Sequence, residues 1–447
     1  MSGPITAAAL VAAFEQSARR GSGPAWLVAR RRVAMARVAE RGLPGPRDED
    51  WKYTSLTPLL EVPFDLGAGD LDGVPSAAAV APFVAGPASW TRLVFVNGRY
   101  AAKLSSIHPD ARGVRIGSLA VAIETEPDAL ERHLAPPGDE GADAFADLNA
   151  ASWVDGALVQ VPDGAVLAEP IQLLFVATAP GAAALSHPRT LIALGKGSRA
   201  TVLESYAALD PDAYLVNAVS ELALDAGAEL DHVVVTAESP RAFHLGRLDA
   251  RLAAGSRLRT CAAAFGGRLV RRAVRARLDG EDAACHLSGV AALAGQQHLD
   301  THTVVDHLRP RCVSRQLFKN VLDGRSRAVF SGRVVVHRGA DGTDAHQTNK
   351  NLLLSDDVEA DSKPQLEIFA DDVKCSHGAS DGQIAEDAVF YLKSRGLDEA
   401  AARTLLTRGF AREVLDRIGS EPVREWCDAR LSTVLREGRV VEGGAHA

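Results

Sequence analysis

The chain has few cysteines and no spacing that would pair them. Only five occur among its 447 residues, an odd number, and no two stand in a C-x-x-C arrangement. A fold stapled by disulfides would need a paired set of thiols, so that class is excluded. We expect reduced thiols and a cytoplasmic location, the five cysteines being Cys261, Cys285, Cys312, Cys375 and Cys427.

Long apolar runs and an excess of positive charge are also lacking. No apolar stretch approaches the roughly 20 residues that cross a bilayer, and the N-terminus lacks the features of a signal peptide. The formal net charge of -8 argues against a protein that neutralises nucleic-acid phosphates. Composition therefore predicts a soluble globular protein without a membrane or nucleic-acid partner.

Short apolar strands recur through the middle of the chain. Apolar and polar residues alternate over 230–235 and 328–336, and no long helical pattern occurs from about 155 to 375. Each strand unit ends in a small turn, and the turn glycines are 33, 30, 28 and 25 residues apart. Such an irregular repeat favours stacked β-helix coils over an antiparallel sandwich. The turn glycines are Gly164, Gly197, Gly227, Gly255 and Gly280.

The first 150 residues predict a different organisation. Helical spacing dominates up to about residue 45, and residues 65–87 predict a loose connection rich in Gly, Ala and Pro. A β-hairpin is expected at 92–98, because Asn97-Gly98 supplies the positive φ angles of a tight turn. We therefore treat residues 1–150 as an N-terminal helical region with a hairpin.

The pattern changes again after the central part. We place the β-helix core at 151–382 and a C-terminal helical domain at 383–447. Helices at the end of a solenoid can cap its last coil or provide a docking surface, and the pattern is compatible with both roles. One helix of the domain carries an apolar stripe that includes Leu405, Leu406 and Phe410.

Enzyme signatures occur only in part. The run 195–198 resembles a phosphate loop but lacks its upstream glycine and precedes a strand, so no nucleotide site is expected. The run 378–382 matches G-x-S-x-G, yet the one later histidine, His446, is one residue from the end. No H-E-x-x-H occurs. In one predicted strand His298 and His302 share a face and His307 points the other way, and structural roles are usual for such histidines.

Cys375 and His377 are the residues with the most suggestive chemistry. Two residues apart in an extended strand, they project from the same side and offer a thiol and an imidazole together. That pair suits iron or a nascent iron-sulfur cluster. Spacing alone favours the simpler interpretation, a buried cysteine beside a hydrogen-bonded histidine.

The segment around this pair carries a family resemblance. Its sequence, KPQLEIFADDVKCSHGA at 363–379, closely resembles the C-terminal signature of SufD proteins in the SufB/SufD family, and so does FYLKSRGL at 390–397. The segments at 314–319 and 351–354 fit the same family, and EDWKYTSL at 49–56 resembles its W-K-Y-T segment. The matches span most of the chain.

The resemblance implies a right-handed parallel β-helix between helical end regions. It also implies a non-catalytic scaffold for iron-sulfur cluster assembly that pairs edge to edge with SufB and binds the SufC ATPase through its C-terminal helices, with a SufD homodimer as another pairing. Iron or a cluster would be held transiently at the SufB interface, His377 leading and Cys375 assisting. The expected partner-binding residues are Tyr391, Leu405, Leu406 and Phe410.

Two alternatives remain at this stage. A SufB-type sulfur acceptor would carry a cysteine where this chain has Asn349 and Lys350, and a glutamate where it has Gly378. A β-helix enzyme acting on polysaccharides would need clustered carboxylates on successive coils. The acidic residues of the repeat, Asp163, Asp225 and Asp282, stand near turns, where Asp is favoured for turn geometry.

Overall fold

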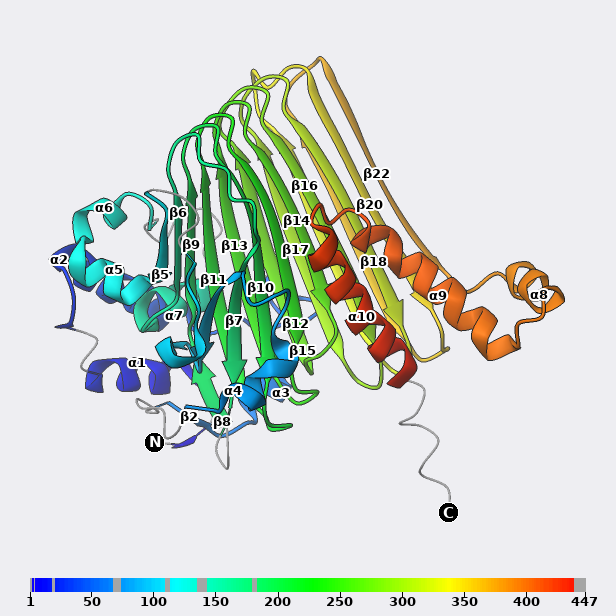
Figure 1. The fold of residues 1–447 in the computed structure, drawn as a ribbon, viewed down its shortest axis with the longest axis horizontal. Coiled ribbons are helices and arrows are strands. Elements are labelled where there is room, and N and C mark those ends of the chain that lie inside the picture. The colour runs from blue at the N-terminus through cyan, green and yellow to red at the C-terminus, as the bar shows by residue number, and fades with distance from the viewer. Residues whose placement is uncertain are drawn as a thin grey trace.

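Two long β-sheets face one another along the molecule in the computed structural model, which describes residues 2–3, 5–17, 21–66, 74–108, 113–134, 143–178 and 183–437 (Figure 1). Neighbouring strands within each sheet are parallel along the main body. The chain passes alternately from one sheet to the other, so the parallel β-helix predicted from the repeat is confirmed.

The first sheet ends at β22 and the second at β21. In spatial order the first contains β22 (Val373–Gly382), β20 (Thr343–Leu353), β18 (Val313–Leu322), β16 (Ala284–Leu293), β14 (Arg257–Ala264), β12 (Glu229–Ala237), β10 (Arg199–Ala208), β7 (Ile171–Ala177), β3 (Thr91–Val96) and β4 (Arg99–Tyr100). The second contains β1 (Ser2–Gly3), β2 (Phe64–Asp65), β8 (Ala183–Ser186), β11 (Leu215–Leu224), β13 (Phe243–Leu252), β15 (Leu269–Leu278), β17 (His298–His307), β19 (Arg327–Val336) and β21 (Glu359–Ile368), with β5 (Arg115–Ser118), β6 (Ala157–Val161) and β9 (Arg189–Leu194) beside its start.

Successive coils are held in register by the strand ladder. One coil takes 27 to 31 residues, as the aligned positions of the first sheet show: Arg199, Glu229, Arg257, Ala284, Val313, Asp344 and Lys374. Because side chains alternate along a strand, every second residue points into the lumen and stacks on its equivalent in the next coil. In the first coils this lumen is aromatic, with the rings of Phe95, Phe175 and Tyr206 stacked at 4.9 Å spacings.

The turns form a second ladder between coils. The amide of Gly255 donates to the carbonyl of Glu281, the amide of Asp282 to Pro310, and the amide of Arg311 to Asp341. Gly255 has φ 64°, and Asp282 and Arg311 hold the same left-handed conformation at φ 59°. The glycine spacing predicted the last turn of the repeat at Gly280. That position was wrong, because Asp282 and not Gly280 continues the turn ladder. Gly280 instead lies against the previous coil, where a Cβ would come within 2.0 Å of the Ala254 nitrogen.

The N-terminal region contributes strands to the solenoid as well as helices around its start. The hairpin turns at Asn97 and Gly98, with φ 46° and 75°, and its strand β3 pairs in parallel with β7. Within the expected loose connection, residues 67–73 lie outside the described residues. The helices are α1 (Ala7–Gln16), α2 (Ala25–Arg41), α3 (Thr57–Leu60), α4 (Ala77–Val80), α5 (Leu119–Thr125), α6 (Pro127–Glu131) and α7 (Ala144–Ser152), with 3-10 turns η2 (Glu49–Trp51), η3 (Ala81–Phe83) and η4 (Ala102–Leu104).

In the described part of the chain, three helices follow the last coil. They are α8 (Glu386–Ser394), α9 (Glu399–Leu415) and α10 (Glu421–Glu437). α9 and α10 cover the outward face of the first sheet, where Val414 and Leu415 pack on Val290 and Leu317, while α8 projects beyond β22 (Figure 1). No helix in the described part of the chain is long and apolar enough to span a membrane. Residues 438–447 of the expected C-terminal domain lie outside the described residues.

Gly332 provides a test of the lumen packing. A Cβ at this position of β19 would lie 2.1 Å from Nε2 of Gln347 and 2.7 Å from Cζ of Phe330. We expect Gly332→Ala to lower the free energy of unfolding by about 1–3 kcal/mol, the usual cost of overpacking. Urea denaturation of the purified chain measures it. Gly378→Ala is the control, since that strand glycine has nothing within 4 Å of its Cβ position, and equal midpoints for the two variants would refute the packing.

Candidate functional site

The last strand of the first sheet carries both residues of the predicted site. β22 pairs with β20 along one side, and its other side has no neighbouring strand among the described residues. Such an edge presents unpaired backbone N–H and C=O groups, which another strand can pair with. Cys375 and His377 therefore lie on an open β-edge at the end of the solenoid.

Both side chains belong to the row that faces the lumen. Cys375 lies opposite Ala345 and His377 opposite Gln347, and both of these partners on β20 are fully buried. Cys375 is partly buried beside Leu366, whereas His377 is exposed. The sequence spacing thus correctly placed the two on one side. The simpler expectation was a buried cysteine beside a hydrogen-bonded histidine, but Cys375 is only partly buried and His377 makes no hydrogen bond to another described side chain.

The lumen becomes polar beneath His377. Its register neighbours are Gln347 and then Gln316, both buried. Oε1 of Gln316 accepts a hydrogen bond of 2.7 Å from Thr303 on the facing sheet, but Nε2 of Gln316 and both polar atoms of the Gln347 amide have no partner within the described protein. Buried amides without protein partners are uncommon. The open end of the solenoid is therefore lined by hydrogen-bonding groups, in contrast to its aromatic start.

A second polar row ends at the same opening. Asn320 donates to Asn351 at 2.8 Å, and Asn351 in turn donates to Asp381 on β22 at 2.7 Å. Asn349 donates to Ser362 of β21 at 2.9 Å. These contacts connect the last strands of both sheets, so they fix the backbone that carries the candidate site.

The chemistry of the pair is that of an incomplete ligand set. Burial raises the pKa of the Cys375 thiol, so the thiol is protonated at neutral pH unless a metal ion displaces its proton. Soft thiolate and imidazole ligands suit iron and iron-sulfur clusters. Among the described residues no three His, Cys, Asp or Glu side chains converge as metal ligands. Any remaining ligands would have to come from another molecule.

The C-terminal helices carry three exposed large apolar side chains, Phe390 and Tyr391 on α8 and Leu405 on α9, which are 74%, 56% and 50% exposed. We call these three residues the helix patch. Of the other predicted partner-binding residues, Leu406 is half-buried. Phe410 packs toward the solenoid, with the Lys319 ammonium 4.3 Å from its ring centre. The predicted stripe therefore divides into an exposed part and a part that attaches the helix.

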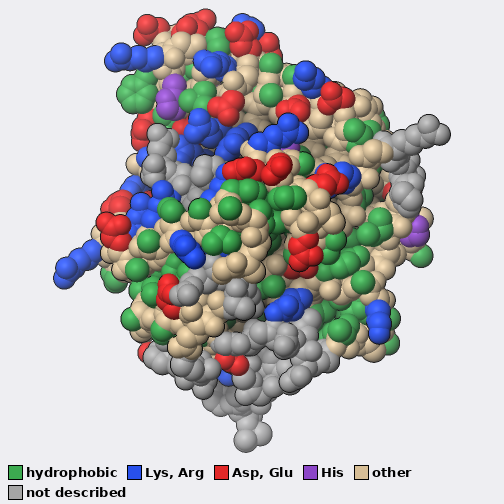
Figure 2. All heavy atoms as spheres, turned by 90° about the vertical axis from the view of Figure 1, so that its left-hand side faces the viewer, with side chains coloured by type: hydrophobic (Ala, Val, Ile, Leu, Met, Phe, Trp, Pro, Cys, Tyr) green, Lys and Arg blue, Asp and Glu red, His purple; other side chains and the backbone are tan. Residues whose placement is uncertain are grey.

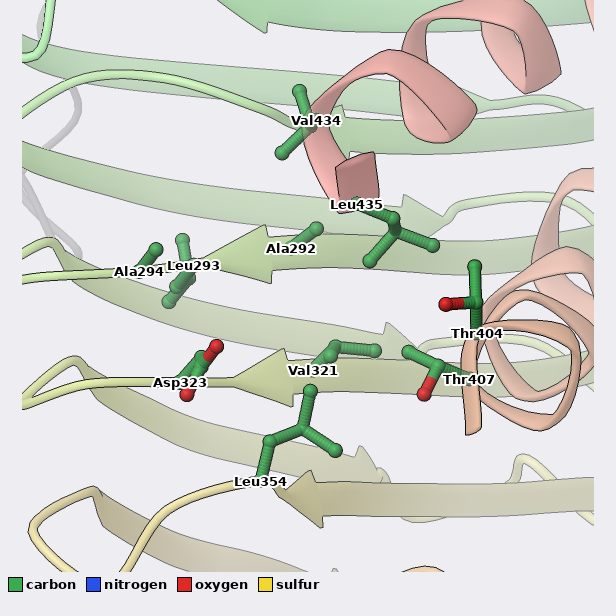
Figure 3. Close-up of a pocket in the computed structure, with 10 residues that line it drawn as sticks. All are labelled: Ala292, Leu293, Ala294, Val321, Asp323, Leu354, Thr404, Thr407, Val434 and Leu435. Atoms are coloured by element: carbon green, nitrogen blue, oxygen red, sulfur yellow. The ribbon is translucent and has the colours of Figure 1, made fainter. Parts of the chain in front are cut away.

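The attachment of α9 and α10 is tight. Figure 3 shows Thr404, Thr407, Val434 and Leu435 of the two helices around side chains of the first sheet such as Val321. The space left between them is about 30 Å³, far below the several hundred Å³ of a typical ligand pocket. This contact seats the helices on the solenoid and leaves no room for a ligand.

The W-K-Y-T segment is fastened to the outward face of the second sheet. Trp51 is 4% exposed, and the Arg271 guanidinium lies 4.0 Å from the centre of its ring. Thr54 donates a 2.6 Å hydrogen bond to Asp300 and lies 3.1 Å from Nε2 of His298. Burial alone would raise the pKa of Asp300, but Arg271 and the other groups around it lower it to about 2. An ionised Asp300 therefore anchors the segment.

The strand faces predicted for the three histidines are confirmed. His298 and His302 lie on the outward face of β17, where His302 contacts Asp300 at 2.9 Å. His307 is fully buried in the lumen, 2.9 Å from the Ser314 hydroxyl. All three have structural partners.

Charges of both signs mix on the side that carries the N-terminal helices. Figure 2 shows Lys and Arg side chains interspersed there with Asp and Glu. Local pairs include Arg30 with Glu131 at 3.6 Å and Arg115 with Glu126 at 3.1 Å. Cations paired in this way lack the unbalanced field that draws polyanions.

Comparison with known families decides what kind of protein this is. Residues 175–410 match the family described as "SUF system FeS cluster assembly, SufBD core domain", and residues 9–173 match the SufBD protein N-terminal region. The chain belongs to the SufB/SufD family. Its coils, open edge and attached helices are thus those of a protein family of iron-sulfur cluster assembly.

Individual relatives of this SufB/SufD chain support the same family assignment. A SufBD family protein of Synechocystis sp. is 34% identical over 418 residues, 92% of this chain and 91% of that protein. The iron-sulfur cluster assembly protein SufD of Escherichia coli is 30% identical over 416 residues, 90% and 92% of the two chains. The chloroplast protein ABCI7 of Arabidopsis thaliana is 32% identical over 295 residues, 64% of this chain and 62% of its own length.

Sequence reasoning missed part of the surface at the open end of this SufB/SufD chain. Ile368 is the last residue of β21, the end strand of the second sheet, and Phe369 follows it. Their side chains are 41% and 58% exposed. Both lie within the family signature, but strand alternation did not distinguish an uncovered end from another covered coil. The signal available was that no further strand pattern follows residue 382.

Proposed function

We propose that this chain is a cytoplasmic scaffold subunit that pairs with SufB along the open edge of β22 and helps to hold iron or a nascent cluster at that interface. The observation that carries the proposal is that Cys375 and His377 lie side by side on the one strand of the first sheet whose edge ends the solenoid. An open edge accepts a strand from another chain, and an incomplete ligand set needs ligands from another chain.

The chain would take the iron-holding side of the pair and not the sulfur-accepting side. Asn349, at the place where SufB-type chains carry a cysteine, is 1% exposed and hydrogen-bonded to Ser362. No thiol is available there. We therefore assign sulfur acceptance to the partner and give this chain His377 as its principal ligand, with Cys375 as a second ligand.

The helix patch is the surface that we propose for the SufC ATPase. It lies on α8 and the start of α9, on the side of the C-terminal helices that does not contact the solenoid. Exposed aromatic side chains next to one another usually mark an interaction site. Movement of these helices by an ATPase would be transmitted to the β22 edge, because only a short segment after β22 separates the two.

The acidic turn residues make structural contacts. These contacts argue against the alternative of an enzyme that acts on polysaccharides. Asp163 accepts a 2.8 Å hydrogen bond from the backbone amide of Lys196, and Asp282 pairs with Arg311 at 2.8 Å. Both carboxylates are thereby engaged in the turn ladder. A scaffold accounts for the open edge and the helix patch, which an enzyme of that class would not need.

Reconstitution tests the proposal directly. The purified chain mixed with SufB and SufC should elute with both in size-exclusion chromatography, and the complex formed under anaerobic conditions should contain iron and sulfide. Elution of the chain by itself as a dimer would identify the homodimer as the pairing. Failure to associate with SufB in any nucleotide state would refute the scaffold assignment.

The helix patch makes a separate prediction. Replacing Tyr391 and Leu405 together by alanine should weaken SufC binding by about 30-fold or more, since one buried aromatic anchor such as Tyr391 contributes about 2 kcal/mol or more at an interface. Surface plasmon resonance with immobilised SufC measures this. Val121→Ala on α5, equally exposed at 57%, is the control. Unchanged SufC affinity in the double variant would mean that the ATPase binds elsewhere.

A further inference from the structure

A cavity of about 210 Å³ lies where the end of α9 meets the outward face of the first sheet. It is separate from the β22 edge and from the helix patch. Its floor is formed by neighbouring strands, and its rim by the chain that leaves α9 at Arg417 to Gly419. The residues that decide its character are Arg259, His286, Arg315 and Arg417.

Three of these residues form one row across the sheet. His286 lies between Arg259 and Arg315 in the register of β14, β16 and β18. Neighbouring strands are about 4.8 Å apart, so two guanidinium groups flank one imidazole. Arg417 approaches the same space from the helix side. Four nitrogen-rich side chains therefore surround a space that a small ligand can enter.

Two carboxylates pair with the arginines of the row: Asp231 of β12, which itself lines the cavity, and Asp344 of β20. The Asp231 carboxylate accepts hydrogen bonds from Nε and Nη2 of Arg259, and the bond from Nη2 to Oδ2 is 2.9 Å long. Asp344 pairs with Arg315. Glu413, one turn before Arg417 on α9, pairs with Lys319. The centre of the row thus keeps a positive field, and burial together with Arg315, Arg259 and Arg417 lowers the pKa of His286.

The imidazole of His286 and the guanidinium of Arg417 make no hydrogen bond or ion pair to any described residue. The larger groove beneath the W-K-Y-T segment, about 740 Å³, shows the contrast. There Arg275 pairs with Asp306 at 3.0 Å and Arg271 pairs with Asp300. Of these two cavities, the smaller one combines a positive field with donors that have no partner among the described residues.

We propose that this cavity binds a tetrahedral oxyanion of the phosphate type. Guanidinium groups bind phosphate oxygens through paired N–H donors, and here they line the cavity from β14, from β18 and from the segment after α9, with the His286 imidazole of β16 between them. At the rim, beyond the end of α9, Arg424 donates to the Ile418 carbonyl at 3.1 Å and satisfies that acceptor. A cavity of about 210 Å³ has room for a phosphate group.

Titration of the full-length chain with inorganic phosphate tests the site. Isothermal calorimetry at constant ionic strength, with chloride replacing phosphate in the reference, should give saturable binding. Removing one charged donor costs about 1.5–3 kcal/mol, so Arg417→Gln should weaken the affinity about tenfold or more. His286→Ala should weaken it in the same direction. Arg412→Gln is the matched control, since Arg412 lies five residues before Arg417, on α9, and pairs with Asp416 at 3.4 Å.

A comparison of two ligands identifies the source of the anion, and two results would overturn the proposal. Equal affinity for phosphate and for adenosine monophosphate would show that the cavity accepts the phosphate of a larger molecule, and preference for free phosphate would show that it accepts the ion alone. Absence of saturable binding by the folded wild-type chain would overturn the proposal. So would equal phosphate affinity in Arg417→Gln and Arg412→Gln.

Discussion

Replacing Trp51 by alanine should lower the free energy of unfolding by about 3–5 kcal/mol, the usual cost of deleting a large buried aromatic side chain. Trp51 is 4% exposed and lies between the Arg271 guanidinium and the ring of Phe145, whose centre is 5.5 Å away. Its loss would leave a cavity and would also remove the planar surface on which Arg271 rests.

The loss should extend beyond the cavity itself. Thr54 and Glu49 flank Trp51 and fasten the same segment to Asp300 on β17 and to Lys363 on β21. With Trp51 removed, these contacts would lose the support that keeps them in place. We therefore expect a lower urea midpoint together with faster proteolysis of the segment around residue 50.

Phe390→Ala is the control for this experiment. Phe390 is 74% exposed, and surface substitutions of that kind usually change stability by no more than about 0.5 kcal/mol. If Trp51→Ala and Phe390→Ala unfolded at the same urea concentration, the segment would contribute nothing to the solenoid, and its docking on the second sheet would be wrong.

The amino-acid pattern was sufficient to predict the coils because the β-helix repeats locally. Alternation such as that of residues 230–235 and turn glycines such as Gly227 depend on the chain's own backbone preferences. The continuation of the turn ladder at Asp282 and Arg311 was not predictable in this way. These residues hold a left-handed conformation that most side chains avoid, and their ion pair with one another forms only once the coils have stacked.

Long-range packing was likewise beyond the pattern. The parallel pairing of β3 with β7 joins residues about 80 positions apart, and nothing local to the hairpin indicates it. In the C-terminal helices the apolar stripe was visible, but the sequence did not show that Phe410 faces the solenoid while Leu405 faces solvent. Which part of a stripe is covered depends on the surface it packs against, and that surface is built from distant strands.

The candidate site was also only partly predictable from the local sequence. That Cys375 and His377 point to one side followed from their spacing. That this side is the lumen, and that the lumen is polar there, depends on Gln347 and Gln316 in preceding coils. The open end of the solenoid therefore explains why a lumen-facing histidine is exposed.

The second large effect concerns His377. His377→Ala should reduce the iron and sulfide content of the complex with SufB and SufC by about tenfold or more, since even outer-shell changes at metal sites commonly cost 10–100-fold in affinity. The substitution should leave folding nearly unchanged, because His377 is exposed and makes no hydrogen bond to another described side chain. The expected defect is thus one of chemistry and not of stability.

The experiment separates ligand loss from loss of pairing. Size-exclusion chromatography should show His377→Ala in the complex as for the wild type, while metal analysis and the activity of iron-sulfur enzymes in cells fall. Cys375→Ser should have a smaller effect, because burial raises the pKa of that thiol and a metal ion has to displace its proton before it binds. The matched control is His346→Ala, which removes an exposed histidine from the outward face of β20.

Each outcome assigns a different role to the edge. Normal complex formation with depleted iron would place His377 at the metal, as proposed. Loss of the complex would mean that His377 serves the pairing of the strands, since side chains on an added edge strand contribute to the specificity of pairing. Full cluster content and full cellular activity would remove His377 from the site. The open β22 edge would then act through its backbone alone.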